Sequence, residues 1–118
     1  MTAYAIAHLH EVEMCPAIVE YLEKIDATLA PYGGRFVIHG GRVEQLEGAF
    51  KGDLIVIEFE DRERARAWYR SAAYQAILPL RTEHATGVAF LIDQVAQPHR
   101  ATDVLADVPG LSDVRGAR

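Results

Sequence analysis

The chain has 118 residues, of which 50% are hydrophobic and 25% are charged, as is typical of a single soluble globular domain. Seventeen acidic residues against twelve Lys and Arg give a net charge of −5, which argues against nucleic acid or an anionic membrane as the main partner. The single cysteine excludes an intrachain disulfide, and no apolar run approaches the roughly 20 residues of a membrane span. The first residues lack the basic start and long apolar run of a signal peptide, so we expect a cytoplasmic protein.

The first half of the chain predicts a strand, a helix and a second strand. Residues 4–10 alternate in the way that gives a strand two distinct faces. Apolar residues then recur at helical spacing from about Pro16, until Pro31 and the glycine pair at 33–34 end the helix. Residues 35–46 indicate a second strand, and the glycine pair at 40–41 suggests a bulge within it.

The second half predicts a strand, two helical segments and a last strand. Residues 54–59 are almost entirely apolar, which indicates a central strand buried on both faces. Asp61 is a candidate helix N-cap, and Ser71 restarts the helix as a second N-cap before Pro79 bends or ends it. Residues 87–93 form the last strand, which completes a ferredoxin-like β-α-β-β-α-β order. Right-handed crossovers then give an α+β fold with a four-stranded antiparallel sheet, in the order 4-1-3-2, and both helices on one face.

Both faces of the predicted sheet are largely apolar, although the helices cover only one of them. An uncovered apolar face of this size usually marks an interface. We therefore predict a C2 homodimer in which two sheets pack face to face and form an α/β barrel. On the central strand the two faces carry Ile55, Ile57 and Phe59 on one side and Leu54, Val56 and Glu58 on the other.

Residues 96–118 differ in character from the domain predicted over residues 1–95. They are rich in Asp, Pro, Gly and Arg, and few apolar side chains are available to anchor them. We expect a C-terminal extension with one short helical turn that packs on the partner subunit. The candidate anchors are Val104, Leu105, Val108 and Leu111.

Six short motifs, taken in order, resemble a known bacterial family. They are YGGRF at 32–36, GG at 40–41, LEG at 46–48, IEF at 57–59, ARAWYRS at 65–71 and YQAILPLR at 74–81. Together they are similar to the family called domain of unknown function 1330, over residues 2–95. The resemblance implies a dimeric α/β-barrel fold and no particular reaction. Arg70, where that family often has Asn, and the long C-terminal extension depart from its usual pattern.

The same resemblance extends, more distantly, to other small dimeric barrels. Among them are cofactor-free monooxygenases, muconolactone isomerases and haem-degrading enzymes. This second step is an analogy of fold alone, and it assigns no chemistry to any residue of this chain.

Glu58 is the first catalytic candidate, because a carboxylate on an otherwise apolar strand is costly unless it is paired or protonated. It would act as a general base or ligand anchor, or it would form a salt bridge with Arg35, Arg42 or Arg81. Folding the hairpin about its turn places His39 diagonally near Glu58, unless the glycine pair shifts the register. Such a pair suits proton transfer, and it equally suits a polar contact at a dimer interface.

Tyr69, Ser71 and Tyr74 gather at the break between the two helical segments, where their hydroxyls would orient a ligand between helix and sheet. Ser71 alternatively serves only as an N-cap. Arg35 is a further candidate for positioning a substrate. A local basic face would bind an anionic substrate or, alternatively, pair with neighbouring glutamates in solvent. Its members are Arg62, Arg64, Arg66, Arg70 and Arg81.

The histidines and the cysteine give weaker signals. His8 and His10 alternate on one strand face at a spacing that can present two imidazoles to a metal, although surface strand ends often carry such residues. No third ligand is fixed, because His39, His84 and His99 are too scattered in sequence to be placed. Cys15 precedes a helix start, and without a matched base we expect it to be inert. We therefore assign no metal site and no cofactor.

Three functions are compatible with these features. The leading hypothesis is a homodimeric protein that binds a small organic ligand and performs cofactor-independent acid–base or oxidative chemistry. His39 and Glu58 would then be the acid–base pair, and Tyr69 and Arg35 would position the substrate. The second is a non-catalytic dimeric binding or scaffold module in which Glu58 only closes a salt bridge. The third is a metal- or haem-dependent barrel that uses His39 or the histidines of the first strand.

Overall fold

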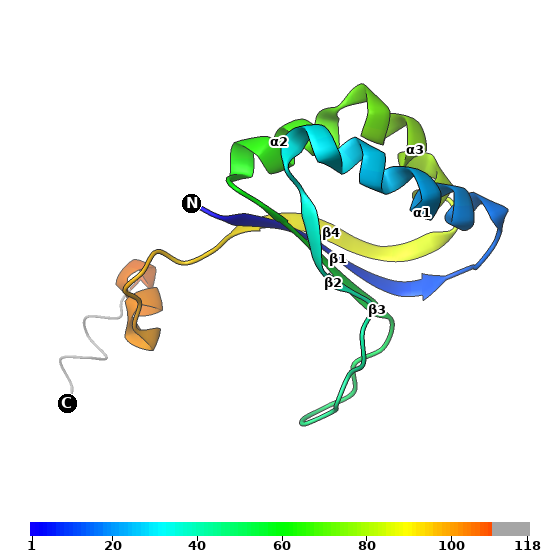
Figure 1. The fold of residues 1–118 in the computed structure, drawn as a ribbon. Coiled ribbons are helices and arrows are strands. Elements are labelled where there is room, and N and C mark those ends of the chain that lie inside the picture. The colour runs from blue at the N-terminus through cyan, green and yellow to red at the C-terminus, as the bar shows by residue number, and fades with distance from the viewer. Residues whose placement is uncertain (110–118) are drawn as a thin grey trace.

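A computed structural model of the chain describes residues 1–109, and Figure 1 shows their arrangement. The first half forms β1 (Ala3–Val12), α1 (Pro16–Leu29), the 3-10 turn η1 (Ala30–Tyr32) and β2 (Arg35–His39). A proline begins α1, where its missing N–H costs no hydrogen bond. Strand β2 ends at His39 and does not continue to residue 46 as predicted, because Gly40 and Gly41 both adopt positive φ angles that leave the strand conformation.

The second half forms β3 (Asp53–Phe59), α2 (Arg62–Arg70), α3 (Ala72–Thr82), β4 (Ala85–Asp93) and the 3-10 helix η2 (Ala101–Asp107). Both predicted N-caps are present. The carboxylate of Asp61 accepts a hydrogen bond from the Arg64 N–H at 2.8 Å, and the Ser71 hydroxyl accepts one from the Tyr74 N–H at 3.2 Å. Pro79 lies inside α3 and does not end it. None of the helices within residues 1–109 is long and apolar enough to cross a membrane.

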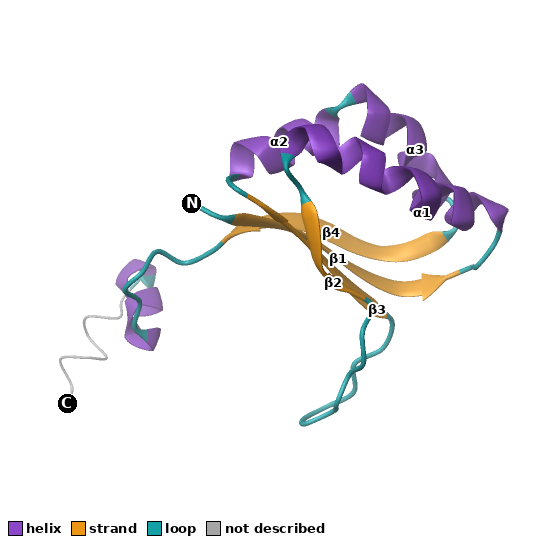
Figure 2. Cartoon of the chain, viewed as in Figure 1, coloured by secondary structure: helices purple, strands orange, loops and turns teal. Residues whose placement is uncertain are grey.

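The four strands form one antiparallel sheet in the order β2-β3-β1-β4, as predicted. Figure 2 shows all three α-helices on one face of this sheet and none on the other. The hydrophobic core fills part of the space between the helix layer and the sheet. Its buried members are Tyr21, Ile25, Leu29, Ile57, Phe59, Ala65, Trp68, Tyr74 and Ile77.

An irregularity in the middle of β2 decides which face carries His39. Arg35 lies opposite Glu58, and a regular register would then place His39 opposite Leu54. The register shifts by one residue instead, so that His39 lies opposite Ile55. Directly opposed residues share a face of an antiparallel sheet, so His39 lies on the helix side and Glu58 on the open side. The predicted proximity of His39 and Glu58 is therefore wrong, because one extra residue in β2 moves His39 to the opposite face of the sheet.

The open face of the sheet is apolar and lacks a cover within the described chain. Its exposed large apolar side chains come from the two outer strands, and each is between 42% and 53% exposed. An uncovered sheet face with several half-exposed apolar side chains favours the face-to-face dimer predicted from the sequence. The side chains are Ile38, Val88, Phe90 and Ile92.

Beyond β4 the chain leaves the domain. In Figure 1 the segment that follows Asp93 runs away from the sheet, and η2 lies apart from the helices and strands. Val104 is 63% exposed and Val108 is 45% exposed, so these predicted anchors contact little of their own domain. The short helical turn predicted for the extension is present, whereas the predicted anchor Leu111 lies outside the described residues. Packing of this extension on a partner subunit stays a prediction.

Candidate functional site

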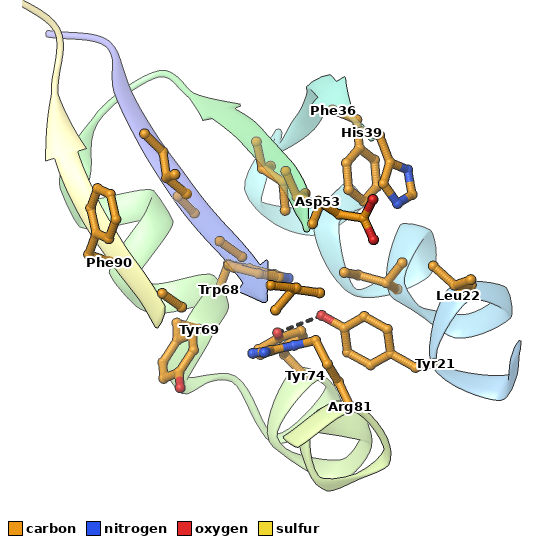
Figure 3. A pocket seen from close by; sticks show the side chains of 18 of the residues that line it. Tyr21, Leu22, Phe36, His39, Asp53, Trp68, Tyr69, Tyr74, Arg81 and Phe90 are labelled. Carbon is orange, nitrogen blue, oxygen red and sulfur yellow. Dashed lines mark hydrogen bonds between the residues drawn. The ribbon is translucent and has the colours of Figure 1, made fainter. Parts of the chain in front are cut away.

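A cavity of about 870 Å³ opens between the helix layer and the sheet, and Figure 3 shows it from close by. This volume lies in the range of small-molecule binding pockets. Apolar side chains from α1 and from the helix face of the sheet make up most of its wall. They include Leu9, Ile18, Leu22, Ile25, Phe36, Ile55, Ile57 and Leu91.

Small residues on the helix face of the central strands create this space. Ala5 and Ala7 of β1 point toward the helices, and Ala7 lies opposite Ala89 of β4. The methyl group of an alanine is too short to fill the space between the sheet and the helices that cover it. The alternation of β1, with alanines on one side and larger residues on the other, therefore leaves a hollow under the helices.

A buried polar cluster forms one end of the cavity. The hydroxyl oxygens of Tyr21 and Tyr74 lie 2.7 Å apart and share a hydrogen bond, drawn as a dashed line in Figure 3. Both side chains are buried. Burial, reinforced by the neighbouring Tyr74, raises the pKa of Tyr21 well above its ordinary value. Tyr21 therefore stays a neutral hydroxyl, able to donate a hydrogen bond, throughout the physiological pH range.

Arg81 completes this cluster. Its guanidinium lies 5.8 Å from the centre of the Tyr21 ring, within the range of a cation–π contact. Burial disfavours its charge, but the hydroxyls of Tyr74 and Tyr21 outweigh that effect, so the pKa of Arg81 is raised. No carboxylate within residues 1–109 forms an ion pair with Arg81. A half-buried cation beside two neutral hydroxyls is suited to hold a negatively charged oxygen.

Three aromatic rings form the wall next to this cluster. The ring of Tyr74 lies 4.1 Å from that of Trp68 and 5.5 Å from that of Tyr69, measured between centroids. The indole N–H of Trp68 donates to the Thr28 hydroxyl at 2.9 Å, which in turn donates to the Ile25 carbonyl at 2.7 Å. These hydrogen bonds hold the indole in place, and the wall of rings suits a planar organic molecule.

His39 and Asp53 lie on the strand side of the cavity, as Figure 3 shows. The imidazole of His39 stacks on the Phe36 ring, with 4.4 Å between centroids and 9° between planes. Among the described residues that line the cavity, His39 is the single histidine. The cavity therefore combines an imidazole, a type of side chain that can transfer protons, on its strand side with a cationic, hydroxyl-rich cluster on its helix side.

Glu58 and Arg35 lie away from this cavity. The Nε and Nη2 atoms of Arg35 both donate to Oε1 of Glu58, at 3.2 and 2.9 Å. The pair occupies the open face of the sheet, and the Arg35 side chain is 69% exposed. The salt bridge that the sequence analysis gave as the alternative role of Glu58 is therefore present.

The three predicted helix-side candidates divide into two groups. Tyr69 and Tyr74 line the cavity. Ser71 does not, and its hydroxyl donates to the Trp68 carbonyl at 2.7 Å in addition to capping α3. Its side chain is fully used within the protein, as the capping alternative implied.

The basic face predicted on the second helical region also divides. Arg62 pairs with Asp93 at 2.9 Å, and Arg64 pairs with Glu60, both at the surface. Arg66, Arg70 and Arg81 instead line the cavity. Three of the five arginines of this face therefore border the cavity, which favours an anionic ligand.

Of the histidines proposed for a metal or haem, His39 lies apart from the two on β1. The rings of His8 and His10 lie 4.6 Å apart in an edge-on contact, and Nε2 of His8 lies 2.8 Å from the Lys51 carbonyl oxygen. His8 occupies the open face of β1, opposite Leu54, whereas His39 lies on the helix side of β2. These three side chains therefore do not form one ligand set.

Three polar residues of the cavity were not singled out from the sequence: Tyr21, Asp53 and Gln75. Arg81 was considered only as a partner of Glu58 or as part of a basic face. One signal was available for Tyr21, because it lies three residues after Ile18 within the apolar stripe of α1. A tyrosine in such a stripe buries a hydroxyl that needs a partner. Nothing in the sequence identified that partner, which lies 53 positions away.

The fold and the cavity together define a class of protein: a ferredoxin-like α+β domain with a ligand-sized hollow under its helices. Comparison with protein families is more specific. The chain belongs to the family described as domain of unknown function (DUF1330), whose model matches residues 2–95. The resemblance inferred from the sequence motifs is confirmed. A search of the curated proteins finds no significant match.

Solved structures share the fold at low sequence identity. The protein RPA0582 of Rhodopseudomonas palustris, of unknown function, superposes with a TM-score of 0.60 at 14% identity, covering 80% of this chain and 83% of that one. A dimeric ferredoxin-like protein of unknown function from Jannaschia gives 0.56 at 16% identity, covering 81% and 100%. A variant of SnoaB, a cofactor-independent oxygenase from Streptomyces nogalater, gives 0.50 at 14% identity, covering 83% and 98%. The predicted α+β, ferredoxin-like fold is confirmed.

Proposed function

We propose that this protein is a homodimer that binds a small, mainly apolar organic molecule carrying an acidic oxygen, and that it transforms this molecule without a bound cofactor. The observation that carries the proposal is the apolar cavity with Arg81, Tyr21 and Tyr74 at one end. A phenol, an enol or a carboxylate on a ring system has the matching chemistry. Its apolar body fits the aromatic and aliphatic walls, and its oxygen fits the cationic cluster.

His39 is the residue that we propose for proton transfer. An imidazole accepts a proton near neutral pH, and this one lines the cavity. The proton of a substrate O–H or acidic C–H would move to the imidazole, and the electron pair would stay on the substrate. Arg81 and the tyrosine hydroxyls would stabilise the negative charge that develops on the substrate oxygen.

The oxidative version of this chemistry adds dioxygen as the oxidant. An ionised phenol or enol is electron-rich, so it would be oxidised while dioxygen is reduced, with no flavin or metal required. The oxygenase activity of SnoaB, whose fold is similar, supports this version at the level of fold analogy. Acid–base chemistry alone, such as an isomerisation, would use the same proton transfer.

The homodimer is supported by the uncovered apolar face of the sheet and by the similar fold of the dimeric ferredoxin-like protein from Jannaschia. We propose that two open faces pack together, which would place the Arg35–Glu58 pair at or beside the interface. The C-terminal extension would reach the partner through its exposed valines. Sedimentation at micromolar concentration tests the dimer, and a monomeric mass would contradict it.

A binding screen tests the ligand class. Purified protein would be heated with matched aromatic compounds that carry a phenol, an enol, a carboxylate or only a methoxy group. We expect the ionisable compounds to raise the melting temperature and the methoxy analogues to have little effect, because only the former offer an anion to Arg81. Equal effects for both sets would reject the proposed site.

Turnover is tested with the compounds that bind. We expect His39→Gln to keep ligand affinity within about threefold and to lose most of the rate, since general acid–base catalysis contributes roughly 10²–10⁴-fold. Oxygen consumption without added cofactor would identify the oxidative version. An active His39→Gln variant would exclude His39 as the proton acceptor.

A second candidate is a non-catalytic binding module. The observation that favours it is the completed salt bridge of Glu58, which leaves that carboxylate without a free role. Tight binding of a compound that neither changes nor consumes oxygen would support the module over the enzyme.

A further inference from the structure

Three side chains of different metal-binding types converge where β1 ends and β4 begins. They are Glu13, Cys15 and His84, and one donor atom of each lies within 4.8 Å of the donor atoms of the other two. Nδ1 of His84 lies 3.3 Å from Oε1 of Glu13. Within residues 1–109, no other group of three His, Cys, Asp or Glu side chains brings its donor atoms this close together.

Regular backbone structure holds the group together. Strands β1 and β4 are paired up to Val12 and Ala85, and the Glu13 N–H then donates to the His84 carbonyl at 2.8 Å. Cys15 follows within two residues and stands immediately before α1. The three side chains thus project from the ends of a strand pair and a helix, and not from a long loop, which favours a preformed site.

The residue type at position 15 has no structural explanation in the fold. Cys15 occupies the N-cap of α1, a position that favours Ser, Thr, Asp or Asn, yet its side chain makes no capping hydrogen bond. The thiol is free and half-buried. An inert cysteine is expected from the sequence, in which no partner can be placed, whereas the structure brings an imidazole and a carboxylate close to it.

We propose that Glu13, Cys15 and His84 bind a zinc ion, with water in the fourth position. Zinc bonds to sulfur, nitrogen and oxygen are about 2.3, 2.0–2.1 and 2.0–2.2 Å long, so tetrahedral ligand atoms lie roughly 3.3–3.7 Å apart. The Glu13–His84 pair already has this spacing, and small side-chain rotations bring in the thiol. A mixed set of thiolate, imidazole and carboxylate selects zinc over calcium or magnesium, which require oxygen ligands.

The site lies at the border of the cavity and is separate from the chemistry proposed there. Val12 and Met14, the residues on either side of Glu13, both line the cavity. A bound ion would tie the end of β1, the start of α1 and the start of β4 into one unit. We therefore expect zinc to stabilise this wall of the cavity, while the proton transfer proposed for His39 needs no metal.

Cobalt is the probe that reports the thiolate directly. Reduced protein, freed of metal with a chelator, would be titrated with Co²⁺ and followed by absorbance. We expect one equivalent to produce a sulfur-to-cobalt charge-transfer band in the near ultraviolet, and Zn²⁺ to remove this band by displacement. Titration of Zn²⁺ against a coloured chelator would then give the zinc affinity.

Two ligand variants and one control test the assignment. We expect Cys15→Ser to abolish the charge-transfer band, and Cys15→Ser and His84→Gln each to lower zinc affinity at least about tenfold, whereas His10→Gln leaves both unchanged. Serine is a good N-cap, so the first variant keeps α1 intact, and circular dichroism would verify this. Zinc should also raise the melting temperature of wild type and not of Cys15→Ser.

Three results would overturn the proposal. One is wild-type protein that shows no saturable band with Co²⁺. Another is zinc affinity that is equal in wild type and Cys15→Ser. The third is one ion shared by two chains, which would show that Cys15 binds metal only by cross-linking molecules.

Discussion

The two faces of the sheet are built from the same alternating strands, but one borders an unfilled space under the helices and the other exposes apolar side chains. On the helix side, the alanines of β1 and β4 are too short to fill the space, and a cavity of about 870 Å³ remains. On the open side, Val88, Phe90 and Ile92 stand in a row about half exposed. One face therefore has room for a ligand, and the other has surface for a partner.

Charge is distributed between the faces in a corresponding way. Arg81 on the helix side has hydroxyls and a ring as neighbours, and no carboxylate within residues 1–109 pairs with it. Arg35 on the open side is neutralised by Glu58. An unneutralised cation favours a ligand anion, whereas a neutralised pair can be covered by another subunit. Four predictions test this division.

The largest effect should come from truncating one aromatic residue on each face. Phe59 is 1% exposed on the helix side, and we expect Phe59→Ala to lower the free energy of unfolding by about 3–5 kcal/mol at any protein concentration. Phe90 is 47% exposed on the open side, and Phe90→Ala should act by weakening the dimer. Urea denaturation at several protein concentrations, together with sedimentation, separates the two effects.

The division would fail if Phe90→Ala destabilised the protein as much as Phe59→Ala with no change in mass or concentration dependence. That result would mean that the open face belongs to the core of a monomer. The apolar row on β4 would then need another explanation than a second subunit.

The next effect concerns the hollow itself. Ala7→Leu adds a branched side chain under the helices, and we expect it to lower the affinity of any cavity ligand more than about tenfold. The free energy of unfolding should change by less than about 1.5 kcal/mol, since the added atoms enter existing space. Val88→Leu, on the open face of β4, is the matched control and should leave ligand affinity unchanged. Calorimetric titration of both variants makes the comparison.

A feature could be predicted from the sequence when the interaction that creates it joins residues close together in the chain. Features created by contacts between distant residues could not be predicted in this way. Asp61 and Ser71 were identified as N-caps because a cap bonds to a backbone N–H three residues away. The strand order followed from the β-α-β-β-α-β sequence of elements and the handedness of crossovers. His39 was placed on the wrong face because the shift within β2 arises from its pairing with β3.

The polar end of the cavity depends on contacts between residues that lie still farther apart in the sequence. Tyr21 comes from α1, whereas Tyr74 and Arg81 come from α3, and only the packing of these two helices brings them together. Helical periodicity marks Tyr21 as inward-facing but does not say what it meets. Tyr69 and Tyr74 were correctly placed beside a space between helix and sheet, because both lie at the helix break that Ser71 caps.

A smaller effect should appear in the pH dependence of stability. The pKa of Tyr21 is raised in the folded protein, chiefly by burial and then by Tyr74, from an ordinary value of 10.0. An unfolded chain can therefore release this proton above about pH 10 while the folded chain retains it, so stability falls as pH rises from there. We expect Tyr21→Phe to flatten this alkaline fall, as measured by urea denaturation between pH 8 and 11.

Titration of tyrosine absorbance provides the check. If Tyr21 stays protonated, Tyr21→Phe should leave the phenolate signal at pH 10 unchanged. A loss of one tyrosine from that signal would show that the polar end of the cavity is open to solvent.

The smallest effect is expected at the salt bridge of the open face. Glu58→Gln removes the charge that neutralises Arg35, and because Arg35 is 69% exposed we expect a cost of about 1 kcal/mol or less. Ligand affinity and turnover should match wild type, since neither residue lines the cavity. Steady-state rates and urea denaturation on the same preparation would measure both. If Glu58→Gln folds normally but loses all turnover, the reaction takes place on the open face, where the sequence first suggested it. The cavity would then have no part in catalysis.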